Sequence, residues 1–177
     1  MKVYFIGAGP GDPELITVKG QRLIESCPVI LYAGSLVPRE IFSNCEKDGN
    51  KPADKIVDTA SIDLDEIIEH IQQAHENNQN VARIHSGDPS VYGAIGEQIR
   101  RLQELSIDFE IIPGVTATSA SAAWLGKELT LSGVSQSIIM TRYEGKTPFP
   151  ERERLPALAQ SGATLAIHLG VTRIHKI

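Results

Sequence analysis

Short apolar runs alternate with longer amphipathic stretches along much of the chain. The runs are four to six residues long and rich in Val and Ile, which is typical of strands buried in a sheet. The stretches between them place apolar residues every three or four positions, which indicates helices. The pattern predicts strands at 3–7, 29–33, 55–58, 81–85 and 107–112, and helices at 18–26, 63–77 and 94–105.

The segment that begins at Asp63 carries the clearest helical signal. Asp63 and Glu66 stand three residues apart, the spacing of a capping box at a helix N-terminus. An apolar stripe at helical spacing follows, made of Leu64, Ile67, Ile68, Ile71 and Ala74. Because strands and helices alternate with short connections, the sequence predicts an α/β fold with a mainly parallel sheet covered by helices.

The composition changes after Pro113–Gly114, where small residues dominate the run "TATSASAAWLG". A helix of such residues either packs closely against a neighbour or lets a ligand approach its backbone, and both alternatives stay open. The pattern then predicts a strand at 137–142, a helix at 151–160, a strand at 164–169 and the first turns of another helix at 170–177. We therefore expect an N-terminal domain at 1–112, and at 113–177 a truncated second α/β domain whose last strand lacks a covering layer.

The bulk properties narrow the class of protein. With 177 residues, of which 41% are apolar, the chain can bury a core. Its net charge of −5 and aromatic content of 5% argue against a broad nucleic-acid surface. No apolar stretch approaches the roughly 20 residues of a membrane span, and no apolar signal segment follows Met1–Lys2. Cys27 and Cys45 lack metal-like spacing, so we expect free thiols in a cytoplasmic protein.

Three loops of unusual composition follow predicted strands, at 7–13, 85–93 and 113–121. Ligands of open α/β sheets bind beyond the carboxyl ends of the strands. The first loop, "GAGPGDP", differs from the dinucleotide motif G-x-G-x-x-G because Asp12 replaces the third glycine and Pro10 interrupts the turn. The second strand also ends without an acidic residue. These features disfavour a dinucleotide site, and a structural turn is the simpler alternative.

The other two loops offer groups that suit a polar, zwitterionic small molecule. Gly87 lets a ligand approach the backbone, and we expect its N–H to be available to a carboxylate or a ribose hydroxyl. Asp88 can accept from an ammonium or a ribose. Thr116 and Ala117 can begin a helix and present free N–H groups.

Several common sites are poorly supported. The chain has no G-x-x-x-x-G-K-[ST] phosphate loop, no H-E-x-x-H or C-x-x-C zinc motif and no G-x-S-x-G nucleophile elbow. His85 and His168 fall at strand ends, where each either lines a cleft or is simply a hydrogen-bonded histidine. We expect no metal or flavin held by the protein.

In order and in register, these segments resemble the tetrapyrrole methylase family, the class III methyltransferases that use S-adenosylmethionine. The resemblance is carried by "VYFIGAGPGDPELITVKG", "CPVILYAGSLVP", "RIHSGDPSVYG" and "EIIPGVTATSASAA". It implies two α/β domains with a cleft between them, a homodimer, and a cofactor folded into that cleft. Carried onto this sequence, the cofactor positions are Pro10, Ser86, Gly87, Asp88, Thr116, Ala117 and Leu169.

Two further segments, "YAGSLVP" at 32–38 and "MTRYEGKTPFPERERL" at 140–155, resemble one branch of the family. That branch methylates carbon 11 of precorrin-4 or cobalt-precorrin-4 in cobalamin biosynthesis. Acceptors of other branches, such as uroporphyrinogen III, precorrin-2 or diphthine, remain alternatives, as does a non-catalytic binding module.

An electron-rich ring carbon is already a nucleophile, so the implied work of the protein is in-line positioning and exclusion of water. A base can take up the released proton; His85, Asp88 and Glu144 are candidates by location, and none is assigned. The implied substrate carries several carboxylates while the chain is acidic, so basic groups must face it. Arg142, Lys146 and Arg39 are the expected contacts.

Overall fold

The computed structural model describes residues 1–42, 53–145 and 148–177. They divide into two compact units, Met1–Thr116 and Ala117–Ile177. The division falls a few residues beyond the boundary expected from the sequence. Cys45 and Lys146 lie outside the described residues.

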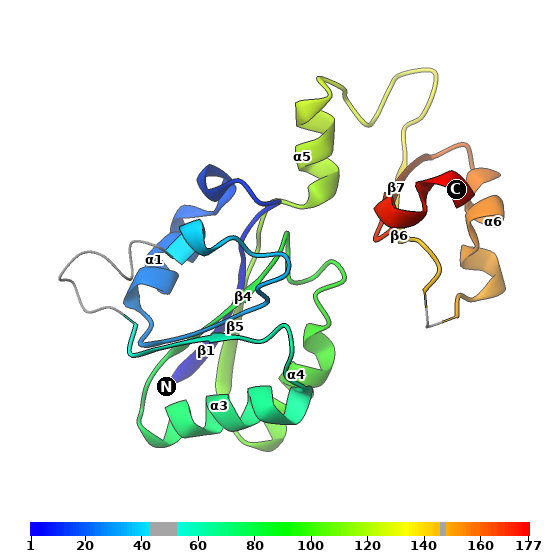
Figure 1. Cartoon of the computed structure of the whole chain (residues 1–177). Helices are drawn as coiled ribbons and strands as arrows, with labels where there is room; N and C mark the ends of the chain where they lie inside the picture. Colours follow the sequence, from blue (N-terminus) through cyan, green and yellow to red (C-terminus); the bar gives the residue numbers. More distant parts are fainter. Residues whose placement is uncertain (43–52, 146–147) are drawn as a thin grey trace. The chain divides into compact units, whose positions relative to one another are not determined.

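A five-stranded parallel sheet forms the centre of the first unit, with the strand order β3-β2-β4-β1-β5 (Figure 1). Every strand lies within one residue of its predicted bounds, so the periodicity of the apolar runs is confirmed as a strand signal. The strands are β1 (Lys2–Gly7), β2 (Val29–Tyr32), β3 (Lys55–Asp58), β4 (Val81–His85) and β5 (Asp108–Ile112).

Helices cover both faces of this sheet: α1 (Val18–Ser26) on one face, α3 (Leu64–Glu76) and α4 (Ile95–Glu104) on the other (Figure 1). Both α1 and α3 begin at side-chain caps, and the cap predicted for α3 is confirmed. The side chain of Thr17 accepts from the N–H of Gly20 at 3.1 Å at the start of α1. Asp63 and Glu66 form the reciprocal capping box at the start of α3. Two short 3₁₀ turns, η1 (Pro13–Leu15) and η2 (Arg39–Phe42), were not predicted.

Two apolar layers result from the alternation of side chains along the strands. In β1, Ile6 packs in the layer under α1, together with Ile24 of that helix. Phe5, its neighbour, packs in the opposite layer with Ile71 of α3 and Leu102 of α4. All five side chains are fully buried, and each such burial contributes about 1.5–3 kcal/mol to stability.

The chain changes direction between β1 and β4, which lie side by side in the sheet. β1 continues through α1 to β2, whereas β4 continues through α4 to β5 on the opposite face (Figure 1). This is the topological switch point at which open α/β sheets bind ligands. The loops that follow these two strands are 8–17 and 86–94.

The second unit contains a parallel pair of strands, β6 (Ile138–Arg142) and β7 (Thr164–His168). It begins with α5 (Ala117–Trp124), as the run of small residues predicted. The helix predicted at 151–160 is wrong in one respect, because it is split into η3 (Glu151–Glu153) and α6 (Leu155–Ala159). Pro156 lacks an N–H and therefore fits only the first turn of a new helix. The final segment, η4 (Val171–Lys176), is a 3₁₀ turn.

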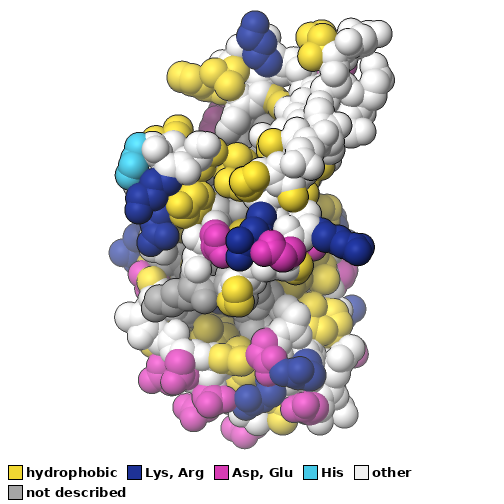
Figure 2. Space-filling view, turned by 90° about the vertical axis from the view of Figure 1, so that its right-hand side faces the viewer, with side chains coloured by type: hydrophobic (Ala, Val, Ile, Leu, Met, Phe, Trp, Pro, Cys, Tyr) yellow, Lys and Arg dark blue, Asp and Glu magenta, His cyan; other side chains and the backbone are white. Residues whose placement is uncertain are grey.

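No helix within the described part of the chain combines the length and apolar character needed to cross a bilayer. On the face drawn in Figure 2, acidic and basic side chains of the described residues are interspersed.

Candidate functional site

The loops after β1 and β4 are joined to each other by their backbones. The N–H of Gly87 donates to the carbonyl of Gly9 at 2.7 Å, and the N–H of Gly9 donates back to Gly87 at 3.2 Å. The N–H of Ala8 also donates to the carbonyl of His85 at 2.8 Å. The expectation that the Gly87 N–H is available to a ligand is therefore wrong, because that donor joins the two loops.

Asp88 connects the same loop to the one that follows β5. Its Oδ2 accepts from the N–H of Gly114 at 3.0 Å, and its Oδ1 accepts from the N–H of Ser90 at 2.7 Å. Its carbonyl accepts from Val91. The carboxylate thus holds both its own loop and its neighbour, so the three glycine-containing loops form one hydrogen-bonded edge at the switch point.

Two glycines, Gly7 and Gly114, make this close approach possible. A Cβ on Gly7 would lie 2.6 Å from Gly114 Cα and 2.6 Å from the carbonyl oxygen of Gly87, and a Cβ on Gly114 would overlap that same oxygen. The other side of Gly87 is open, since a Cβ there would meet only the carbonyl of Val115, at 4.0 Å. A ligand can therefore approach the backbone at Gly87, which fits a cofactor bound against main-chain atoms.

In the second unit, the two expected cofactor positions each adjoin a residue of one hydrogen-bonded pair. Thr118 in α5 and His168 at the end of β7 bond at 2.8 Å between Oγ1 and Nε2. Ala117, at the start of α5, and Leu169, after β7, adjoin this pair. Leu169 has a φ of 57° and a side chain that is 69% exposed. Backbone strain of this kind at a bulky residue gathers at functional sites.

The expected cofactor residues fall into two groups, one in each unit. In the first unit, the loop contacts place Ser86, Gly87 and Asp88 beside the loop that ends at Thr116. Pro10 is exposed, immediately after Gly9. Sequence reasoning missed Gly9 and Gly114 as loop contacts, although each follows an apolar strand in a glycine or proline context, which was the available signal.

His85 is a poor candidate for a base. Its side chain is 6% exposed and lies beside Phe5, with ring centroids 5.9 Å apart. Burial, reinforced by the nearby Arg83 cation, lowers the pKa of His85 to about 3. Its Nε2 is buried and has no hydrogen-bond partner among the described residues, so the expectation of a hydrogen-bonded histidine is wrong for that nitrogen. A general base works best with a pKa near the operating pH.

The two other candidate bases differ in their surroundings. Both carboxylate oxygens of Asp88 already accept backbone N–H groups. Glu144 is exposed, two residues after the end of β6.

The predicted substrate contacts are basic side chains of both units. Arg142, in β6, is half-buried, and its Cζ lies 4.5 Å above the ring of Phe149. This stacking helps to hold the guanidinium in place, and its Nη1 also donates to the carbonyl of Tyr143 at 3.3 Å. Arg39 is exposed at the start of η2.

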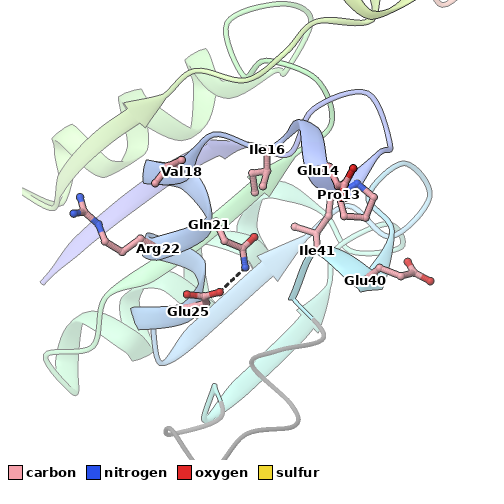
Figure 3. A pocket seen from close by; sticks show the side chains of 9 residues that line it. All are labelled: Pro13, Glu14, Ile16, Val18, Gln21, Arg22, Glu25, Glu40 and Ile41. Carbon is pink, nitrogen blue, oxygen red and sulfur yellow. Dashed lines mark hydrogen bonds between the residues drawn. The ribbon is translucent and has the colours of Figure 1, made fainter. Parts of the chain in front are cut away.

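A hollow of about 530 Å³ lies in the first unit between η1, α1 and η2 (Figure 3). Its lining carries three carboxylates, Glu14, Glu25 and Glu40, against one cation, Arg22. Gln21 donates to Glu25 at 2.7 Å along α1 (Figure 3). The net acidic lining is a poor match for a substrate rich in carboxylates.

Comparisons with known proteins show the family to which the chain belongs. Residues 2–177 match the family described as Tetrapyrrole (Corrin/Porphyrin) Methylases. The chain is 62% identical over its whole length to a precorrin-4 C(11)-methyltransferase of Pseudomonas aeruginosa, of which it spans 68%. The crystal structure of a cobalt precorrin-4 methyltransferase matches 99% of the chain with a TM-score of 0.91 and 43% identity, and the chain covers 71% of it.

A uroporphyrin-III C-methyl transferase of Thermus thermophilus, solved with S-adenyl homocysteine, is more distant. It matches 98% of the chain with a TM-score of 0.72 and 29% identity, and the chain covers 68% of it. The family match covers nearly every residue. The chain belongs to the tetrapyrrole methylase family.

Proposed function

We propose that the protein transfers a methyl group from S-adenosylmethionine to carbon 11 of precorrin-4 or cobalt-precorrin-4, a step of cobalamin biosynthesis. The observation that carries this proposal is the 62% identity, over the whole chain, to a precorrin-4 C(11)-methyltransferase. The linked loops at the switch point support it, because they form an edge where a cofactor can contact main-chain atoms.

The cofactor is held, in this proposal, by Pro10, Ser86, Gly87, Asp88 and Thr116 of the first unit. Ala117 and Leu169 contribute from the second unit. The open side of Gly87 and the left-handed backbone of Leu169 fit this assignment. S-adenosylmethionine held by these residues would supply a sulfonium methyl group to the ring carbon, with S-adenosylhomocysteine as the leaving group.

The residues of the chain then position and shield the reactants. The loops fixed by Asp88 hold the cofactor in one place, which lowers the entropic cost of in-line attack. Arg142, Arg39 and Lys146 bind carboxylates of the tetrapyrrole and offset the acidic net charge of the chain. No residue is assigned as the base.

Uroporphyrinogen III is the alternative methyl acceptor, because the chain also has the fold of the uroporphyrin-III C-methyl transferase of Thermus thermophilus. The higher TM-score and identity of the cobalt precorrin-4 methyltransferase favour precorrin-4. We further propose a homodimer that acts in the cytoplasm; size-exclusion chromatography with light scattering tests the dimer.

The test of the proposed function is methyl transfer from ¹³C-methyl-labelled S-adenosylmethionine. Precorrin-4, cobalt-precorrin-4 and uroporphyrinogen III are supplied separately, and the product is examined by NMR. Label at carbon 11 of a precorrin-4 substrate is the expected result. Label on uroporphyrinogen III alone would assign the protein to another branch. Binding of the precorrin without transfer of label would favour a binding module.

A further inference from the structure

A buried arginine lies in the apolar layer between the sheet and helices α3 and α4. Arg83 is 5% exposed and pairs in register with Phe5 of β1 and Leu31 of β2. None of the ion pairs within the described residues involves it. Burial lowers its pKa to about 10, so it keeps its charge at neutral pH. A buried cation is costly unless hydrogen bonds satisfy it.

Neutral acceptors from three elements satisfy Arg83. Its Nε donates to Oε1 of Gln98 in α4 at 3.1 Å. Its Nη1 donates to Oγ1 of Thr59, just after β3, at 2.9 Å, and to the carbonyl of Leu31 at 3.5 Å. These bonds fix the guanidinium, and the guanidinium in turn fixes the orientation of the Gln98 amide.

The other end of that amide reaches the loop that carries the expected cofactor residues. Nε2 of Gln98 donates to the carbonyl of Ala94 at 3.3 Å, and Gln98 is 5% exposed. Ala94 is the last residue of the 86–94 loop and the N-cap of α4, where it has no side-chain cap. Gln98 does not replace the absent N-cap acceptor; it adds a side-chain donor to the Ala94 carbonyl and so ties the end of the loop to the buried guanidinium of Arg83.

The end of the loop has a strained backbone that needs such support. Tyr92 and Ala94 have φ values of 56° and 51°, which L-residues rarely adopt. Gly93 between them packs so closely that a Cβ would overlap the carbonyl of Pro89. Strained segments persist when the surrounding structure holds them. At its beginning the loop is held by Gly9 and Gly114, and at its end by Gln98.

We propose that Gln98, oriented by Arg83, is a positioning residue that fixes the 86–94 loop for cofactor binding, an inference that rests on the proposed function. It acts through the Ala94 backbone and does not itself touch the cofactor. Arg83 and Thr59 extend this support to β2 and the end of β3, so the loop is held against most of the sheet.

Two substitutions separate the loop contact from the stability of the core. Gln98→Glu keeps an oxygen that accepts from Arg83 but has no donor for the Ala94 carbonyl at neutral pH. Gln98→Leu removes both bonds. Gln103→Leu, at an exposed position of the same helix, is the matched control. Urea unfolding of the unsubstituted protein and the three variants measures global stability separately from the order of the loop.

Amide hydrogen exchange of Ser90 and Val91, whose N–H groups are bonded within the loop, measures its order in the ligand-free protein. Loss of the neutral bond to Ala94 predicts exchange about fivefold faster in Gln98→Glu and at least as fast in Gln98→Leu, which also loses the bond from Arg83, with Gln103→Leu unchanged. Gln98→Glu should retain the urea midpoint, since the new carboxylate pairs with Arg83. Its affinity for S-adenosylhomocysteine should fall by a similar factor, raising KM for S-adenosylmethionine with little change in kcat.

Exchange rates in both Gln98 variants equal to those of Gln103→Leu would overturn the inference. The inference would also fail if Gln98→Glu exchanged faster only to the extent that its urea midpoint fell, because a general loss of stability would then explain the faster exchange. The exchange measurement needs no ligand. If the unsubstituted protein failed to bind S-adenosylhomocysteine, the proposed function would fail, while the exchange rates would still decide whether Gln98 positions the loop.

Discussion

The carboxylate of Asp88 accepts a hydrogen bond of 3.0 Å from the N–H of Gly114, and so joins the loop after β4 to the loop after β5. The two residues are 26 positions apart in the sequence. With the Gly9–Gly87 bridge, this bond holds three loops at the switch point of the sheet. The expected cofactor positions of the first unit lie on or beside these loops.

Replacement of Asp88 by Asn should loosen this edge. An amide offers one acceptor oxygen where the carboxylate offers two, so either Gly114 or Ser90 loses its partner. Hydrogen bonds to charged groups contribute about 1.5–3 kcal/mol, and urea unfolding should show a loss of about that size. Affinity for S-adenosylhomocysteine should fall as well. Asp108→Asn, at an exposed position in β5, should change neither quantity; equal behaviour of the two variants would contradict the role of Asp88.

Replacement of Gly114 by Ala tests the close approach of the loops. The added Cβ overlaps the carbonyl oxygen of Gly87 and lies 2.8 Å from Gly7 Cα, so backbone must shift, and we expect a loss of at least about 2 kcal/mol. Gly96→Ala is the control, because its Cβ meets nothing within 4 Å in α4. That control should gain about 0.5–1 kcal/mol. Thermal unfolding of both variants gives the comparison, and a well-tolerated Gly114→Ala would refute the packing.

The buried His85 makes stability depend on pH. Its pKa is about 3 in the folded protein and 6.5 when unfolded, so the unfolded chain binds the proton more readily. Its contribution is therefore complete above pH 6.5 and is lost as the pH falls toward 3, with a slope of up to about 1.4 kcal/mol per unit. Urea unfolding at pH 7 and pH 5.5 measures this slope before most carboxylates titrate. A His85→Phe variant should show a flatter profile, and an equally steep one would assign the slope elsewhere.

Arg142 should affect the tetrapyrrole and not the cofactor. Its guanidinium is stacked on Phe149 at the end of β6, and under the proposed function its charge binds a substrate carboxylate. Arg142→Ala should raise KM for the precorrin about tenfold or more, as expected for a charged hydrogen bond, while the Kd for S-adenosylhomocysteine stays constant. Arg152→Ala, an exposed neighbour in the same unit, is the control. An unchanged KM would remove Arg142 from the substrate site.

The strands and helices of the first unit could be predicted because each carries its own periodicity. Asp63 and Glu66, for example, specify a helix start through local contacts alone. The loop contacts could not be predicted in the same way. The pairing of Gly9 with Gly87 depends on the order of strands in the sheet, and no local pattern encodes that order.

Arg83 shows a second limit of sequence reasoning. In "VARIH" it stands within an apolar strand, and its acceptors are distant in sequence, with Gln98 15 residues away and Thr59 24 residues away. Arg83 lies two residues after Val81 and therefore on the same face of β4, the face covered by α3 and α4. That spacing was the available signal that the arginine is buried. Such a residue is satisfied only by tertiary contacts, which a strand pattern does not specify.

We infer that these loops form a site for S-adenosylmethionine and not for a dinucleotide. Isothermal titration of the protein with S-adenosylhomocysteine, and separately with NAD⁺, tests this inference most directly. We expect saturable binding of S-adenosylhomocysteine at one site per chain, weakened by Asp88→Asn, and no comparable heat with NAD⁺. Tighter binding of NAD⁺, or no binding of S-adenosylhomocysteine, would contradict the inference.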